Sequence, residues 1–149
     1  MTTHLDKPIK LVMIVRDPRG IMSSRYLPAM DWCRDDTTCA EIDMLCDHHI
    51  TLVRYEDLSL NAIETAKRLY NKLDLHFNAD IESWIESHTN DTTKLGNPYS
   101  TVRKSKSAVF SWVKRLNATQ IDTIQEKCTG VMDYLGYNII DIKNLQEFR

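Results

Sequence analysis

The sequence predicts an α/β fold in which parallel strands form a sheet and helices lie on its faces. A continuous apolar run from Lys10 to Val15 is typical of a strand that is buried on both faces, as in a parallel sheet. A second short strand is predicted at Thr51–Tyr55, and apolar residues recur at helical spacing directly after it, over 62–73. Strands that alternate with packing helices indicate a layered α/β architecture.

The connection after the first strand begins with residues 17–20, which read Asp-Pro-Arg-Gly and are expected to break the strand. We expect a short helix from Ile21 to Met30 that ends at Pro28 or soon after it. Residues 40–47 could add one or two further helical turns.

The second half of the chain is predicted to be mainly helical. The helix over 62–73 can be capped by Ser59 or Asn61. A helix from about 78 to 88 places Trp84 on its apolar face, and the polar residues 89–106 are expected to form a long loop.

The last predicted helix has apolar residues at helical spacing from Ile121 to Leu135. Asn117 or Thr119 can cap its start, and Gly136 suits the position just beyond its end.

The composition is that of an ordinary globular protein, with 149 residues, 42% hydrophobic and 27% charged. This length corresponds to one domain at most, so we expect a single domain over residues 1–149. The composition excludes a disordered tail, a collagen-like fibre and a coiled-coil rod. No apolar run approaches the ~20 residues of a membrane span, and the first ten residues show no secretory signal.

Charge is distributed unevenly, although the formal net charge is only −2. Residues 92–121 contain no acidic residue and six cations: Lys94, Arg103, Lys104, Lys106, Lys114 and Arg115. Such a stretch can attract an anion, most plausibly a phosphate, or it can be a solvated basic face. Nucleic acid is not an expected partner, because the stretch is short and no known nucleic-acid-binding motif is present.

The four cysteines, Cys33, Cys39, Cys46 and Cys128, form no CxxC pair and have no histidine at zinc-finger spacing. A disulfide among them would require an oxidising compartment, and their pairing is open. Two N-x-T sequons, at Asn90 and Asn117, fit such a compartment.

Arg16 follows the first strand, and in open α/β sheets ligands bind beyond the carboxyl ends of strands. Arg16 could therefore contact an anion while a hydroxyl of Ser23 or Ser24 and the N–H groups of a helix start supply further donors. In the alternative interpretation, Arg16 pairs with Asp17 or another acid and Ser24 is only a helix cap.

Residues 15–25 (VRDPRGIMSSR) resemble the 3′-phosphate-binding segment of sulfotransferases, enzymes that use 3′-phosphoadenosine 5′-phosphosulfate (PAPS). That pattern has an arginine after a hydrophobic strand and a serine eight positions later, as Arg16 and Ser24 are here. RDPR followed by SSR resembles the Golgi carbohydrate sulfotransferases, especially the galactose, N-acetylglucosamine and N-acetylgalactosamine 6-O group.

Further blocks resemble the same group in the same order, from about Lys10 to Asn138. They are Trp32-Cys33 with Cys39, LVRYEDL at 52–58, ETAKRLYNKL at 64–73, STVRKS at 100–105, and then Trp112, Leu116, Cys128 and Leu135-Gly136-Tyr137. The resemblance implies a partial P-loop-like sulfotransferase fold and corresponds to the C-terminal part of that domain.

The resemblance also implies residue roles. Arg16 and Ser24 would bind the 3′-phosphate of PAPS, and Arg103 and Lys104 would close over the same nucleotide. Tyr55 would lie near the adenine, although core packing at a strand end is an equal alternative. Arg103 and Lys104 could instead be solvated. Trp112 is expected to pack among the last helices.

The family's 5′-phosphosulfate loop, a strand followed by R-S-G-[ST]-[ST], and its catalytic-base region are not found in this sequence, so the catalytic residues are unknown. The resemblance implies sulfuryl transfer from PAPS to a glycan hydroxyl of the 6-O class, in the Golgi lumen. A full-length homologue would have an N-terminal anchor, and no metal is implied. The alternatives are a non-catalytic 3′-phosphoadenosine-binding remnant and a gene-model fragment without independent activity.

Overall fold

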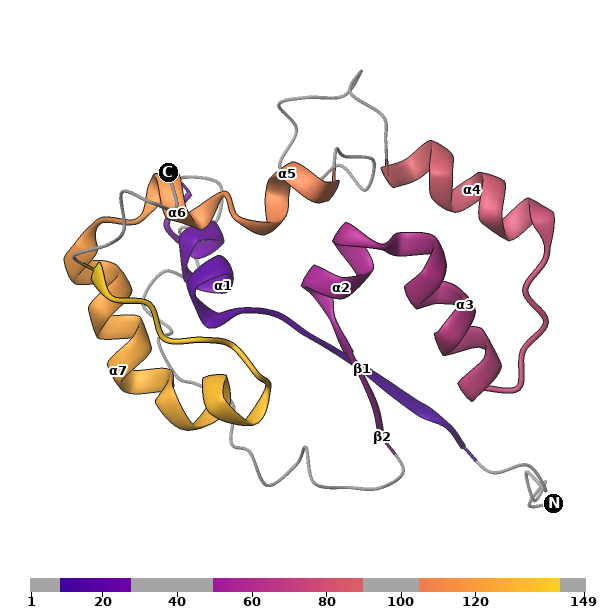
Figure 1. Cartoon of the computed structure of the whole chain (residues 1–149), viewed down its shortest axis with the longest axis horizontal. Coiled ribbons are helices and arrows are strands. Elements are labelled where there is room, and N and C mark those ends of the chain that lie inside the picture. The colour runs from indigo at the N-terminus through magenta and orange to yellow at the C-terminus, as the bar shows by residue number, and fades with distance from the viewer. Residues whose placement is uncertain (1–8, 28–49, 90–104, 143–149) are drawn as a thin grey trace, which may run out of the picture.

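The computed structural model describes residues 9–27, 50–89 and 105–142. These residues form an α/β arrangement, as predicted, with a parallel strand pair and helices on either side of it (Figure 1). In chain order the elements are β1 (Leu11–Val15), α1 (Pro18–Arg25), β2 (Ile50–Arg54), α2 (Tyr55–Leu60), α3 (Ala62–Lys72), α4 (Ala79–Thr89), α5 (Ser105–Val109), α6 (Trp112–Arg115) and α7 (Ala118–Tyr134).

The strands β1 and β2 pair in parallel, in a register that places Leu11 opposite Ile50 and Val15 opposite Arg54. Both strands therefore end at the same edge of the sheet. Arg16 and Tyr55, the residues that directly follow them, lie side by side. This edge carries the candidate site described below.

The prediction that the first strand is buried on both faces is wrong for the described structure. Val15 is buried, whereas Leu11, Val12 and Ile14 are 49%, 39% and 60% exposed. The described sheet contains only β2 as a neighbour of β1, and the described helices cover little of it. Only the carboxyl end of this apolar run is therefore buried among the described residues.

Helix α1 begins at Pro18, three residues earlier than predicted, and ends at Arg25. Asp17 is its N-cap and accepts a hydrogen bond from the backbone N–H of Arg19, while Pro18 supplies a φ angle suited to the first helical turn. The residues expected to break the strand therefore start a helix. As a result, Ser24 lies in the last turn of α1 and not at a helix start.

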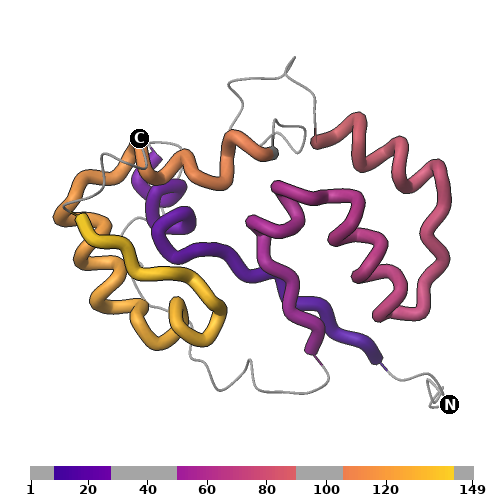
Figure 2. The backbone as a smooth tube through the Cα atoms, viewed as in Figure 1, coloured from indigo at the N-terminus to yellow at the C-terminus, as the bar shows by residue number. Residues whose placement is uncertain are grey.

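The hydrophobic core lies between α1, α6 and α7. It consists of Met22, Trp112, Val113, Leu116, Ile121, Ile124, Cys128, Met132 and Tyr137. As predicted, Asn117 caps α7, in a reciprocal box with Gln120, and Gly136 follows the helix with a positive φ of 70°. The chain then turns back along α7 (Figure 2), where the side chain of Gln125 bonds both backbone groups of Ile140.

Helices α2, α3 and α4 lie on the other side of the strand pair (Figure 1). Asn61 is the N-cap residue of α3 but makes no side-chain capping bond, and α2 was not predicted. Helix α4 forms close to its predicted range but has no buried residue: Trp84 is 61% exposed, and its ring stacks on that of His88. No helix in the described ranges is long and apolar enough to cross a membrane.

Candidate functional site

Arg16 and Tyr55 are in direct contact at the shared carboxyl edge of the strands. The Arg16 guanidinium lies over the Tyr55 ring, with 4.6 Å between Cζ and the ring centroid. This contact follows from the register, because each residue directly follows one member of the terminal Val15–Arg54 pair. A guanidinium over an aromatic face gains about 0.5–2 kcal/mol, depending on its desolvation.

Ser24 contacts the same guanidinium from the last turn of α1. Nη1 of Arg16 donates a hydrogen bond to Ser24 Oγ at 3.3 Å, and Ser24 Oγ donates to the carbonyl of Gly20 at 3.1 Å. The structure therefore brings together three of the five predicted site residues: Arg16, Ser24 and Tyr55.

The Arg16 guanidinium retains capacity to bind a ligand. Its Nε is buried and has no hydrogen-bond partner, and no carboxylate of the described residues is ion-paired with it. The charge of Arg16 is therefore not neutralised by a described carboxylate, so an anion that contacts the guanidinium would supply a missing partner. The alternative that Arg16 pairs with Asp17 is wrong, because the Asp17 carboxylate pairs with Arg19.

The start of α1 offers fewer N–H groups to an anion than the sequence predicts. The Asp17 side chain already accepts the Arg19 N–H at 2.8 Å, and Pro18 has no N–H to offer. An anion bound here would therefore be held by the Arg16 fork and the Ser24 hydroxyl, a charge-assisted arrangement that does not need the helix terminus.

A buried polar network supports this edge, and sequence reasoning missed it. Arg19 forms an ion pair with Asp17 at 2.8 Å, donates to Gln125 and to the carbonyl of Asn138, and lies 4.4 Å from the Trp112 ring centroid. It thus ties α1 to α6, α7 and the segment after α7. The Asp-Pro pair, a helix-start signature, was the signal that could have revealed Asp17 as a cap.

Glu56 is the second buried centre of this network. Its Oε1 accepts the backbone N–H of Asp17 at 3.1 Å, and its Oε2 accepts the Tyr137 hydroxyl at 2.7 Å. Burial, and next the hydrogen bond to Glu56, raise the pKa of Tyr137 far above its usual value, so its phenol stays protonated and donates.

Similarity to known proteins was found over most of the chain. Carbohydrate sulfotransferase 1 of Danio rerio is 27% identical over 172 aligned residues, covering 92% of this chain and 41% of that protein. The human carbohydrate sulfotransferases 1 and 5 are 27% and 26% identical, over 88% and 87% of this chain. The chain is a homologue of the carbohydrate sulfotransferases. This confirms the resemblance to the C-terminal part of these proteins inferred from the sequence blocks.

The homologue spans about 40% of the length of these curated relatives. No family model matches it, and no solved structure matches it.

Several predicted features of this sulfotransferase homologue lie outside the described residues. They are Arg103, Lys104, the sequon at Asn90, and Cys33, Cys39 and Cys46. Cys128 lies in the core and is disulfide-bonded. Trp112 is buried among the last helices, as predicted. Among the described residues, no group of three or more His, Cys, Asp or Glu side chains could hold a metal ion.

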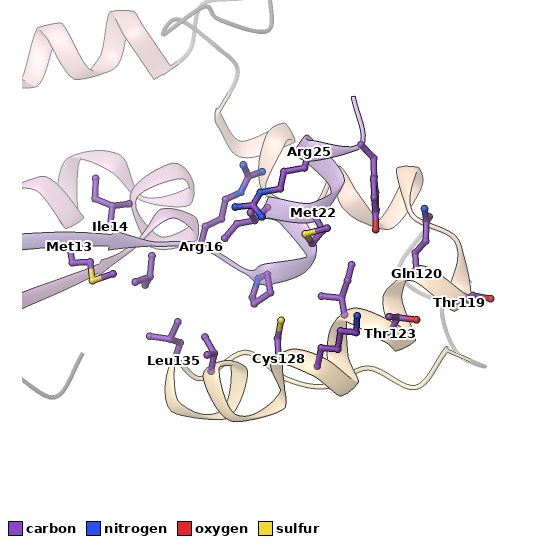
Figure 3. Close-up of a pocket in the computed structure, with 17 residues that line it drawn as sticks. Met13, Ile14, Arg16, Met22, Arg25, Thr119, Gln120, Thr123, Cys128 and Leu135 are labelled. Carbon is purple, nitrogen blue, oxygen red and sulfur yellow. The ribbon is translucent and has the colours of Figure 1, made fainter. Parts of the chain in front are cut away.

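A pocket of about 390 Å³ lies beside Arg16, between β1, α1 and α7 (Figure 3). Arg16, Met22 and Arg25 line it from one side, and Thr123, Cys128 and Leu135 of the α7 region line it from the other. Its charged lining residues in the described part of the chain are all cations: Arg16, Arg25 and Lys127. The pocket thus extends the positive surroundings of Arg16.

Proposed function

We propose that this chain holds the 3′-phosphoadenosine end of PAPS for sulfuryl transfer to a carbohydrate hydroxyl, in the 6-O class. Arg16 and Ser24 bind the 3′-phosphate, and Tyr55 contacts the adenine. Arg103 and Lys104 close over the nucleotide from the basic stretch at 92–121. We assign residues 1–149 to a single sulfotransferase domain.

One observation carries the proposal: Arg16 and Ser24 meet Tyr55, which lies some distance away in the sequence, at the end of the strand pair. The Arg16 guanidinium and the Ser24 hydroxyl beside it fit an anion. The homology to carbohydrate sulfotransferases supports PAPS as the source of that anion and a glycan as the acceptor.

These residues act on the end of the donor that lies away from the sulfur. PAPS supplies the activated sulfuryl group, and Arg16 and Ser24 supply binding energy and orientation. Transfer also needs groups that stabilise charge at the moving sulfuryl group and a base for the acceptor hydroxyl. We assign neither to the described residues, so a non-catalytic 3′-phosphoadenosine-binding module remains the second candidate function.

The Golgi lumen is the proposed location. The disulfide at Cys128 supports an oxidising compartment, and the sequon at Asn117 lies on an exposed residue. The carbohydrate sulfotransferase homology is in keeping with a lumenal site of action.

Calorimetry with adenosine 3′,5′-bisphosphate tests the binding proposal. We expect saturable binding by the full chain and a loss of affinity of at least about tenfold in Arg16→Ala, since a hydrogen bond to a charged group contributes roughly 1.5–3 kcal/mol. Arg68→Ala, which removes an exposed arginine of α3, is the matched control and should bind normally. No saturable heat in the wild type, or equal heat in Arg16→Ala, would refute the proposal. Transfer of labelled sulfate from PAPS to a glycan then separates an enzyme from a non-catalytic binding module.

A further inference from the structure

Glu56 connects three separate segments of the chain through buried hydrogen bonds. Its side chain receives the backbone N–H of Asp17, where α1 begins, and the hydroxyl of Tyr137, beyond the end of α7. Glu56 itself lies in the first turn of α2 and is 7% exposed. One carboxylate thus fixes the relative positions of the starts of α1 and α2 and the segment after α7.

The segments that Glu56 joins carry the proposed donor-binding pair. Asp17 directly follows Arg16, and Glu56 directly follows Tyr55. The bond from Asp17 N to Glu56 Oε1, at 3.1 Å, therefore runs alongside the Arg16–Tyr55 contact, one residue further along each chain segment. Because the Asp17 nitrogen is bonded covalently to the Arg16 carbonyl carbon, a change in this hydrogen bond would move the Arg16 backbone relative to Tyr55.

We propose that Glu56 is a positioning residue for the donor site: it sets the spacing at which the Arg16 guanidinium lies over Tyr55, and Tyr137 fixes Glu56 in turn. This inference rests on the proposed function, because it takes Arg16 as the residue that binds the 3′-phosphate. Glu56 contacts neither Arg16 nor the nucleotide in this role, and it acts through the backbone.

The chemistry of the contacts suits a fixed spacer. A buried carboxylate is costly unless its oxygens are hydrogen-bonded, and each oxygen of Glu56 accepts one donor. The Tyr137 phenol is a donor at neutral pH, and its raised pKa keeps it protonated to higher pH. The Tyr137 ring is itself held by the Arg54 guanidinium, 4.6 Å from its centroid, which also donates to the carbonyls of Leu135 and Gly136.

The 3′-phosphate preference of the full chain tests this inference. It is the affinity ratio between adenosine 3′,5′-bisphosphate and adenosine 5′-monophosphate, both measured by ligand-detected NMR titration. A residue that merely stabilises the fold changes both affinities together, whereas one that acts through Arg16 changes the ratio. Glu56→Ala and Tyr137→Phe are compared with Glu56→Gln, which keeps one acceptor oxygen and replaces the other with an amide NH₂ group. Cooperative melting shows that each variant is folded.

We expect Glu56→Ala and Tyr137→Phe to lower the affinity ratio by roughly threefold to tenfold, which lies within the coupling energies of interacting residues. Glu56→Gln should keep most of the wild-type ratio. An unchanged ratio in folded Glu56→Ala would overturn the inference; if that variant does not fold, an unchanged ratio in Tyr137→Phe would do so. A wild-type ratio near one would instead overturn the proposed function and, with it, this inference.

Discussion

The Arg16 guanidinium packs directly against Gly20, in the first turn of α1. A Cβ atom at Gly20 would lie 3.0 Å from Nε of Arg16 and 3.5 Å from its Cζ. The glycine therefore provides the space that lets Arg16 reach both Ser24 and the Tyr55 ring. Its role is steric, since its φ angle is not in the left-handed region.

Gly20→Ala should weaken the binding of adenosine 3′,5′-bisphosphate while leaving the fold intact. The added methyl group displaces Arg16, so we expect an affinity loss of roughly threefold to tenfold by calorimetry. Alanine also favours the helix by roughly 0.5–1 kcal/mol, so thermal stability should be equal or higher. Gly130→Ala, at an exposed position inside α7, is the control and should raise stability without changing affinity. Normal binding by Gly20→Ala would contradict the steric role.

Ser24→Ala should lower the affinity for the same ligand by about tenfold. The substitution removes the hydroxyl that we propose as an anion ligand, which is also the acceptor that orients Arg16 Nη1. Ser24→Thr keeps the hydroxyl and should bind more tightly than Ser24→Ala. Ser87→Ala, on the exposed surface of α4, is the matched control. Equal affinities for Ser24→Ala and wild type would remove Ser24 from the site.

Arg19→Ala should destabilise the protein by about 3–5 kcal/mol, because it leaves the buried Asp17 carboxylate without its partner. The free energy of unfolding in urea measures this effect. The contrasting variant is Lys67→Ala, which removes a partly exposed ion pair with Glu82 of similar length, 3.0 Å. It should cost less than about 1 kcal/mol. Similar losses of unfolding free energy in the two variants would show that the buried Asp17–Arg19 pair stabilises the fold no more than a partly exposed ion pair does.

Tyr137 should make stability fall at alkaline pH. Burial and the hydrogen bond to Glu56 raise its pKa above the ordinary value of 10.0, so the folded state holds the phenol proton more tightly than the unfolded chain. The stabilisation is therefore complete below pH 10 and decreases as the pH rises above it, by up to about 1.4 kcal/mol per pH unit.

Tyr137→Phe has no such proton to lose. The difference in unfolding free energy between wild type and Tyr137→Phe should thus narrow between about pH 8 and about pH 11, measured by urea denaturation. A constant difference across this range would show that the phenol is not protected in the folded state.

The strands and the candidate site could be predicted from the sequence because their signals are local. The apolar run before Arg16 and the short strand before Tyr55 indicated β1 and β2, and an arginine beyond a strand end indicated an anion site. The resemblance to the sulfotransferase 3′-phosphate segment pairs Arg16 with Ser24, and the structure joins the two side chains by a hydrogen bond.

The supporting network could not be predicted in the same way. The bonds of Arg19 to Gln125 and of Tyr137 to Glu56 join residues 106 and 81 positions apart, and no periodicity marks such pairs. The start of α1 was misassigned for a different reason. Asp17 and Pro18 were treated as strand breakers, whereas a capping carboxylate followed by proline starts a helix. The apolar face that carries Trp84 is exposed in the structure, because helical spacing carries no information about what packs against a helix.

The parallel register has a consequence for how this region tolerates changes in length. The alignment with the Danio rerio relative spans 172 positions, more than the 149 residues of this chain, so the two proteins differ by insertions. Arg16 and Tyr55 are placed by the Val15–Arg54 pairing and not by the chain between the strands. An insertion in the α1–β2 connection can therefore leave the two side chains in contact, whereas one extra residue inside either strand would turn its remaining side chains to the opposite face and separate them.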